Sequence, residues 1–137
     1  MFKNPFSKTI SYPKETIDII RLIRTENIGT RTFHALIKMY GSASNALENI
    51  AELSLRGGKK KPLKVYSENA VESEIKKLSS LGAGIITYRD ENYPKLLKNI
   101  YDFPPVINYL GNKDLLNSKI CAIVGARNAS LNGKNFA

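Results

Sequence analysis

The residues best suited to bind a ligand lie in the stretch AIVGARNASLNGKNFA, residues 122–137. A short apolar run leads into Gly125, Arg127 and Ser130, an order typical of a strand that passes through a phosphate-binding turn into a helix. A dinucleotide site requires glycine two positions after its first glycine, and Arg127 stands there instead. The arginine offers a charged fork for a phosphodiester chain, and Ser130 can cap the helix or donate its hydroxyl to a phosphate. An ordinary strand-to-helix turn with a solvent-facing arginine is the alternative interpretation.

A second candidate is ENIGTRTFHALIKMYGS, residues 26–42, where two amphipathic patterns meet at Gly29. We predict a positive φ at Gly29 and a helix capped by Thr30. This is the layout of a helix-hairpin-helix, in which backbone N–H groups at a helix N-terminus attract a phosphate. Arg31 and Lys38 would add positive charge. A plain hairpin of two helices with a glycine turn fits the same pattern.

A third candidate is the basic loop RGGKKKPLK, residues 56–64. Lys59, Lys60 and Lys61 are consecutive and follow two glycines, so the loop could track a phosphate backbone. A solvated loop without a partner is the equally simple alternative.

The sequence offers no enzyme constellation. His34 and Cys121 are the only histidine and the only cysteine, the carboxylates are scattered, and no serine has a histidine base nearby in the pattern. We therefore expect no catalytic residue, no metal and no cofactor. His34 is predicted to be a packing or surface residue, and Cys121, inside the apolar run ICAIVG, a buried thiol without a disulfide.

The composition favours a polyanionic partner. The formal net charge is +9, and both halves are basic: +6 over residues 1–80 and +3 over residues 81–137. Such a surplus is typical of nucleic-acid-binding proteins, although solubility alone also explains some basic domains. The apolar fraction is 42%, as in a soluble globular protein, and no run of 18 apolar residues or signal peptide is evident. We expect a cytoplasmic protein without a membrane span.

The periodicity divides the chain into a loose lead-in, residues 1–14, a helical domain, residues 15–81, and an α/β part, residues 82–137. Helical patterns begin at Glu15, at Thr30, in SASNALENIAEL and in SENAVESEIKKLSSLGA. Strands are predicted for GIITY, VINYLG and KICAIVG, and the last is apolar almost throughout, as in a parallel sheet covered on both faces. The expected fold class is therefore α followed by α/β.

From about Glu15 onward, the order of motifs resembles the DNA-processing protein A (DprA) family. The most specific part is NYPKLLKNIYDFPPVINYLGNKDLL followed by CAIVGARNASLNG. The shared positions are Tyr93, Pro94, Leu97, Pro104, Pro105, Gly111, Gly125, Arg127, Ser130 and Gly133.

The resemblance implies a sterile-alpha-motif-like or helix-hairpin-helix domain followed by an extended Rossmann fold. It also implies a protein that is not an enzyme, that forms homodimers, and that binds single-stranded DNA. Such a protein helps load the RecA recombinase during natural transformation. At the matching positions of this chain, the resemblance implies that Arg127 is the leading DNA-binding residue, supported by Gly125 and Ser130. Two departures are Asn132, where an aromatic residue is usual, and Asn108, where an aromatic or aliphatic residue is usual.

In the family, the Rossmann part continues well beyond this loop. We therefore expect an N-terminal fragment whose helical domain can fold and whose α/β part is incomplete, because a βαβ unit needs a return strand. Two alternatives are a fragment of a nucleotide-binding Rossmann enzyme and a non-functional remnant of a split gene.

Overall fold

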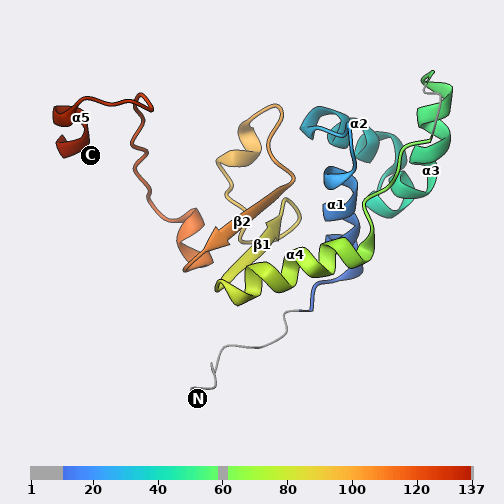
Figure 1. The fold of residues 1–137 in the computed structure, drawn as a ribbon, viewed down its shortest axis with the longest axis horizontal. Helices are drawn as coiled ribbons and strands as arrows, with labels where there is room; N and C mark the ends of the chain where they lie inside the picture. Colours follow the sequence, from blue (N-terminus) through green and yellow to red (C-terminus); the bar gives the residue numbers. More distant parts are fainter. Residues whose placement is uncertain (1–10, 59–61, 137) are drawn as a thin grey trace, which may run out of the picture.

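The computed structural model describes residues 11–58 and 62–136 and shows a helical domain followed by a small sheet (Figure 1). The helices are α1 (Lys14–Arg24), α2 (Thr30–Tyr40), α3 (Ala43–Arg56), α4 (Glu68–Ser80) and α5 (Leu131–Phe136). The strands are β1 (Ala83–Thr87) and β2 (Val106–Leu110), and two short 3-10 helices are η1 (Leu97–Asn99) and η2 (Lys113–Asn117). The predicted helices and the first two predicted strands are confirmed.

Local capping residues explain where the helices begin and end. The side chain of Ser42 accepts a hydrogen bond from the Asn45 N–H at the start of α3, and Ser67 does the same for Ala70 at the start of α4. Gly41 ends α2 with a left-handed backbone, φ 79°, which a residue without a Cβ adopts at little cost. The sharp turn between α2 and α3 follows from these neighbouring signals.

The core consists of two clusters that meet at α1. The first joins α1, α2 and α3, and its buried members are Ile19, Leu22, Ile28, Phe33, Leu36, Ala43, Ala46 and Ile50. The second contains Ile20 of α1, Val71 of α4 and Ile85 of β1. Neighbouring residues of α1, Ile19 and Ile20, thus face different clusters. The helical domain and the sheet therefore share buried apolar surface.

The sheet has two antiparallel strands, with Gly84 opposite Tyr109 and Ile86 opposite Ile107. A Cβ added at Gly84 would lie 2.6 Å from the Tyr109 hydroxyl oxygen, so the tyrosine ring occupies the space above the glycine. Figure 1 shows α4 running alongside β1, whose residues 84–87 are buried. Helix α4 and the buried face of β1 thus close the second cluster.

The third predicted strand is absent from the described residues. Residues 119–125 form no ladder, and the side chains of Ile123 and Val124 are 71% and 90% exposed. The prediction of a buried Cys121 is also wrong, because this cysteine is exposed. An apolar run becomes a buried strand only when a neighbouring strand satisfies its backbone and helices cover its faces. The two strands that do form, β1 and β2, are antiparallel.

Candidate nucleic-acid interface

The helical hairpin predicted at residues 26–42 is present, but its turn differs from the expectation. The left-handed residue is Asn27, φ 65°, whereas Gly29 is extended, φ −88° and ψ 177°. Gly29 itself stands at the N-cap of α2, and Thr30 is the first helical residue. The predictions of a positive φ at Gly29 and a cap from Thr30 are therefore wrong. Asparagine tolerates the left-handed region, so the glycine is not needed for it.

The first turn of α2 presents positive potential to solvent. Its first helical hydrogen bond runs from the Phe33 N–H to the Gly29 carbonyl, so the preceding N–H groups of the turn have no partner within the helix. No side chain caps this helix, and Arg31 is exposed on the same turn. The helix dipole and the guanidinium both favour an anion here. Contact between Gly29, Arg31 and DNA stays a prediction.

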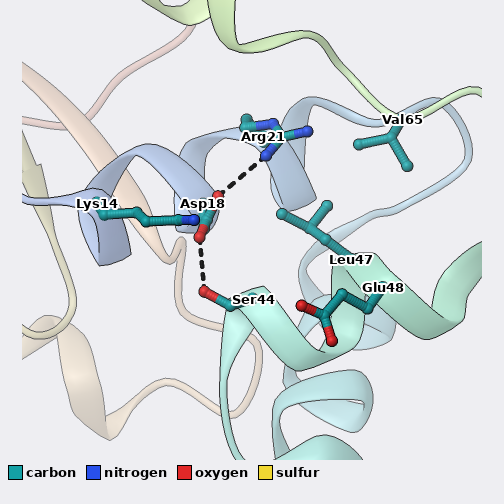
Figure 2. A pocket seen from close by; sticks show the side chains of 7 residues that line it. All are labelled: Lys14, Asp18, Arg21, Ser44, Leu47, Glu48 and Val65. Atoms are coloured by element: carbon teal, nitrogen blue, oxygen red, sulfur yellow. Dashed lines mark hydrogen bonds and ion pairs between the residues drawn. The ribbon is translucent and has the colours of Figure 1, made fainter.

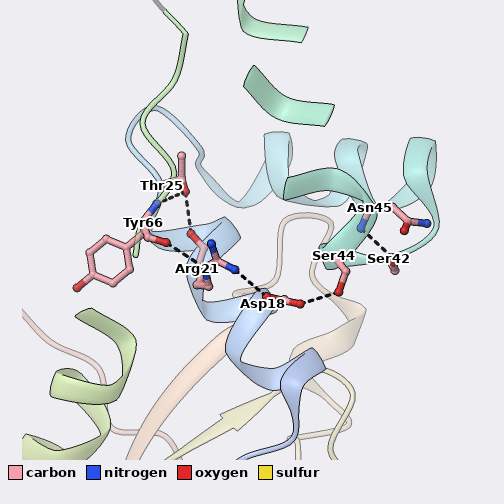
Figure 3. Close-up of polar contacts among 7 residues, drawn as sticks. All are labelled: Asp18, Arg21, Thr25, Ser42, Ser44, Asn45 and Tyr66. Carbon is pink, nitrogen blue, oxygen red and sulfur yellow. Dashed lines mark hydrogen bonds and ion pairs between the residues drawn. The ribbon is translucent and has the colours of Figure 1, made fainter. Parts of the chain in front are cut away.

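Polar contacts hold the hairpin turn against the segment that follows α3 (Figure 3). The Thr25 hydroxyl donates to the Arg21 carbonyl at 2.8 Å and accepts the Tyr66 N–H at 3.1 Å. The Arg21 side chain in turn donates to the Tyr66 carbonyl at 3.1 Å. Thr25 is only 3% exposed, so these bonds are shielded from water. They fix the end of α1 and hence the start of the turn.

A small cavity between α1 and α3 contains a buried carboxylate (Figure 2). Its volume is about 190 Å³, and Asp18 is 2% exposed. One carboxylate oxygen of Asp18 accepts from Arg21 at 3.1 Å, and the other accepts from the Ser44 hydroxyl at 2.6 Å. Both oxygens are therefore engaged in tying α1 to α3. This arrangement supports the fold, and it brings together none of the predicted site residues.

A wider groove of about 490 Å³ lies between α1 and α4. Arg24 donates to the Glu74 carboxylate at 2.8 Å, and this hydrogen bond raises the pKa of the Arg24 guanidinium above its ordinary value. The arginine is charged but already paired. Lys77 also lines the groove and is exposed on α4. The groove contains none of the predicted site residues.

Aromatic side chains join α2 to the segment between the strands. The His34 Nε2–H donates to the Phe103 carbonyl at 2.9 Å, and the two ring centroids are 4.2 Å apart. The Tyr93 hydroxyl donates to the Pro104 carbonyl, and burial raises the pKa of the Tyr93 phenol above its ordinary value. The predicted packing role of His34 is confirmed. Residues 93–104 are thus docked on the helical domain.

This docking places an unpredicted residue beside the hairpin. The Arg31 guanidinium carbon lies 6.0 Å from the ring centroid of Tyr101, and the tyrosine is 87% exposed. Sequence reasoning missed Tyr101, because 70 positions separate it from Arg31. The available signal was local: KNIYDF places two aromatic residues within five positions of a lysine in a basic chain.

The loop with Gly125, Arg127 and Ser130 is exposed. Ser130 caps the short helix α5, since its hydroxyl oxygen accepts the Gly133 N–H at 3.2 Å and its carbonyl accepts the Lys134 N–H at 3.0 Å. The predicted capping role of Ser130 is confirmed. The strand expected before Gly125 is absent, so the loop does not stand at the edge of a sheet.

The structure does not bring the three candidates together. Figure 1 shows α5 beyond the sheet, at the opposite end of the molecule from α2 and α3. The lysines Lys59, Lys60 and Lys61 lie outside the described residues. Within the described residues, no group of three or more His, Cys, Asp or Glu side chains could hold a metal ion. The remaining candidates are therefore two exposed basic elements at separate places.

The fold and these elements define a class: a helical hairpin domain continuing into an α/β part, with exposed arginines and a basic surface. The family comparisons agree in both parts. Residues 13–76 match the DprA-like N-terminal HHH domain, and residues 84–137 match DNA recombination-mediator protein A. The chain therefore belongs to the DprA family of DNA-processing, recombination-mediator proteins. No curated protein matches it. Among the described residues, no helix is long and apolar enough to span a membrane.

Proposed function

We propose that this protein binds single-stranded DNA and helps load the RecA recombinase onto it during natural transformation and recombination. Membership in a recombination-mediator family and the net charge of +9 support this function. The proposed role is binding, with no catalytic residue. The family's homodimer and a cytoplasmic location belong to the same proposal.

The observation that carries the proposal is the exposed turn from Gly125 to Ser130. Arg127 lies in that turn, directly before a helix that Ser130 caps. A planar guanidinium can donate two parallel hydrogen bonds to one phosphate, and Gly125 leaves the backbone accessible. This chemistry recognises a phosphodiester without selecting a base sequence.

Fluorescence anisotropy with a labelled oligothymidine tests the DNA site. Arg127→Ala should weaken binding roughly threefold to tenfold and reduce the slope of log affinity against log salt by about one. Lys76→Ala, a change of equal charge on the exposed face of α4, is the control and should have a smaller effect. Equal losses in the two variants would reject Arg127 as a specific contact.

Loading of RecA requires a separate assay. RecA assembly on oligonucleotides already coated with a single-strand-binding protein should be faster when the full chain is present. Arg127→Ala should reduce this acceleration because the DNA contact is weaker. Normal DNA binding without any acceleration would contradict the loading role and leave the binding role intact.

A further inference from the structure

We propose that Tyr101 and Arg31 form a second contact for single-stranded DNA, in which a base stacks on the tyrosine and the neighbouring phosphate meets the arginine. This inference rests on the proposed function, because it assigns a further part of the surface to the same ligand. It lies on the α2 side of the molecule, away from the loop around Arg127.

Tyr101 is suited to stacking because its ring is exposed and its backbone is held. The side chain is 87% exposed, while the segment around it is closed as a turn and bonded to α2. The Phe103 N–H donates to the Ile100 carbonyl at 3.3 Å, and the Phe103 carbonyl accepts from His34 of α2. The ring is therefore presented by a docked turn, so little ordering is needed when a base stacks on it.

Arg31 and its neighbours supply the charge that a DNA strand requires. The guanidinium carbon of Arg31 lies 6.0 Å from the centre of the Tyr101 ring, within the range of a cation–π contact. Lys38 follows Arg31 by two helical turns and is also exposed, so both lie on one face of α2. Lys98 is exposed on η1, three residues before Tyr101. Its ammonium lies 5.5 Å from the centroid of the Tyr93 ring, so Lys98 adds charge to this segment, while Arg31 is the positive group beside Tyr101.

Two exposed acidic residues lie near this surface in the sequence: Asp102, beside Tyr101, and Glu26, in the turn before α2. Asp102 directly follows Tyr101 and is exposed, so its carboxylate opposes a nearby phosphate. Arg31, Lys38 and Lys98 nevertheless outnumber the two carboxylates. A variant with the opposite effect on affinity follows: Asp102→Asn removes a negative charge and should strengthen DNA binding.

The combination of an exposed ring and flanking positive charge selects single strands. Every base has a flat face that can stack on an aromatic side chain, whereas the bases of a duplex are already stacked on each other. Phosphates interact with the arginine and the lysines in either form. Tyrosine stacking therefore gives a preference for single-stranded over double-stranded DNA, without a base preference.

Two oligonucleotides of equal length separate the roles of the two residues: oligothymidine, and an abasic strand that keeps the phosphates. Anisotropy on the full chain should show that Tyr101→Ala binds oligothymidine about tenfold more weakly and the abasic strand unchanged. Tyr101→Phe keeps the ring and should stay within about twofold of wild type on both. Arg31→Ala should weaken both strands and lower the salt slope by about one.

A second readout does not depend on affinity. An oligonucleotide containing 5-iodouridine should cross-link to Tyr101 on irradiation, and peptide mass spectrometry identifies the site. Lys76→Ala again controls for the loss of one positive charge. Binding of oligothymidine that is unaltered by Tyr101→Ala, with no cross-link at residue 101, would overturn the inference. Absence of any DNA binding by the wild-type chain would instead reject the proposed function itself.

Discussion

Two apolar segments of this molecule have similar sequences, but one is buried and the other is exposed. Strand β1 buries Ile85 and Ile86, which are 4% and 3% exposed, whereas Ile123 and Val124 of the later segment are 71% and 90% exposed. The first segment has β2 beside it and α4 against it. The second segment has no strand beside it in the described part of the chain. An apolar run thus indicates that a segment can form a strand, and the presence of a neighbouring strand decides whether it does.

The same contrast separates the two candidate DNA contacts. Arg31 and Tyr101 lie on elements that the His34–Phe103 contact holds together. Arg127 lies on a turn between an unpaired segment and the six-residue helix α5. A contact on packed elements is ordered before DNA arrives, whereas a contact on an exposed segment must be ordered when it binds, at an entropic cost.

The largest expected difference comes from removing one apolar side chain in each region. Phe33→Ala should lower the free energy of unfolding by about 3–5 kcal/mol, because Phe33 is fully buried in the first core cluster. Val124→Ala should change it by less than about 0.5 kcal/mol, because that side chain is exposed. Urea unfolding followed by circular dichroism measures both. A loss above 1 kcal/mol for Val124→Ala would show that residues 119–125 are packed in solution.

A loss of stability of intermediate size is expected from a change at the contact between the two strands, where Gly84 faces Tyr109. Gly84→Ala would place a Cβ against the Tyr109 ring, and overpacking of this kind costs about 1–3 kcal/mol. The loss should be smaller in a Tyr109→Ala background, where the ring is absent. Urea unfolding of the wild type, the two single variants and the double variant gives the coupling energy. Equal losses in both backgrounds would mean that the cost arises from the strand backbone and not from the ring.

Much of the helical domain and both strands could be predicted from the sequence, because their signals are local. The 3.6-residue periodicity, the serine caps and Gly41 lie within each helix or next to it. The runs GIITY and VINYLG are short and end at turn residues. Each of these features depends on neighbours a few positions away, so the order of elements follows directly from the chain.

The features that the sequence did not predict depend on conformations and contacts that no local pattern specifies. Asn27 adopts the left-handed backbone that was expected for Gly29, since a glycine can take a positive φ but is not compelled to. The burial of residues 119–125 requires a neighbouring strand. The approach of Tyr101 to Arg31 follows from the docking of Phe103 on His34, 69 positions apart. Sequence separation, more than residue type, limited the prediction of the site.

The smallest expected effect concerns the buried phenol of Tyr93, whose hydrogen bond to the Pro104 carbonyl holds the two ends of residues 93–104 together. Burial raises the pKa of Tyr93 in the folded state above its ordinary value of 10.0. As pH rises past about 10, the unfolded chain loses this proton first, so unfolding is favoured. The contribution is fully present below that pH and is lost as pH rises through the folded-state pKa.

Tyr93→Phe should therefore cost about 1 kcal/mol at pH 7, because the hydrogen bond to the Pro104 carbonyl is lost. The difference from wild type should shrink above about pH 10, since only the wild type has a Tyr93 proton whose loss lowers stability. Burial also raises the pKa of Tyr12, so some alkaline loss of stability should remain in the variant. Urea titrations at several pH values measure the difference, with the surface change Tyr101→Phe as control. A difference that stays constant up to pH 11 would show that Tyr93 does not couple its protonation to the packing of this segment.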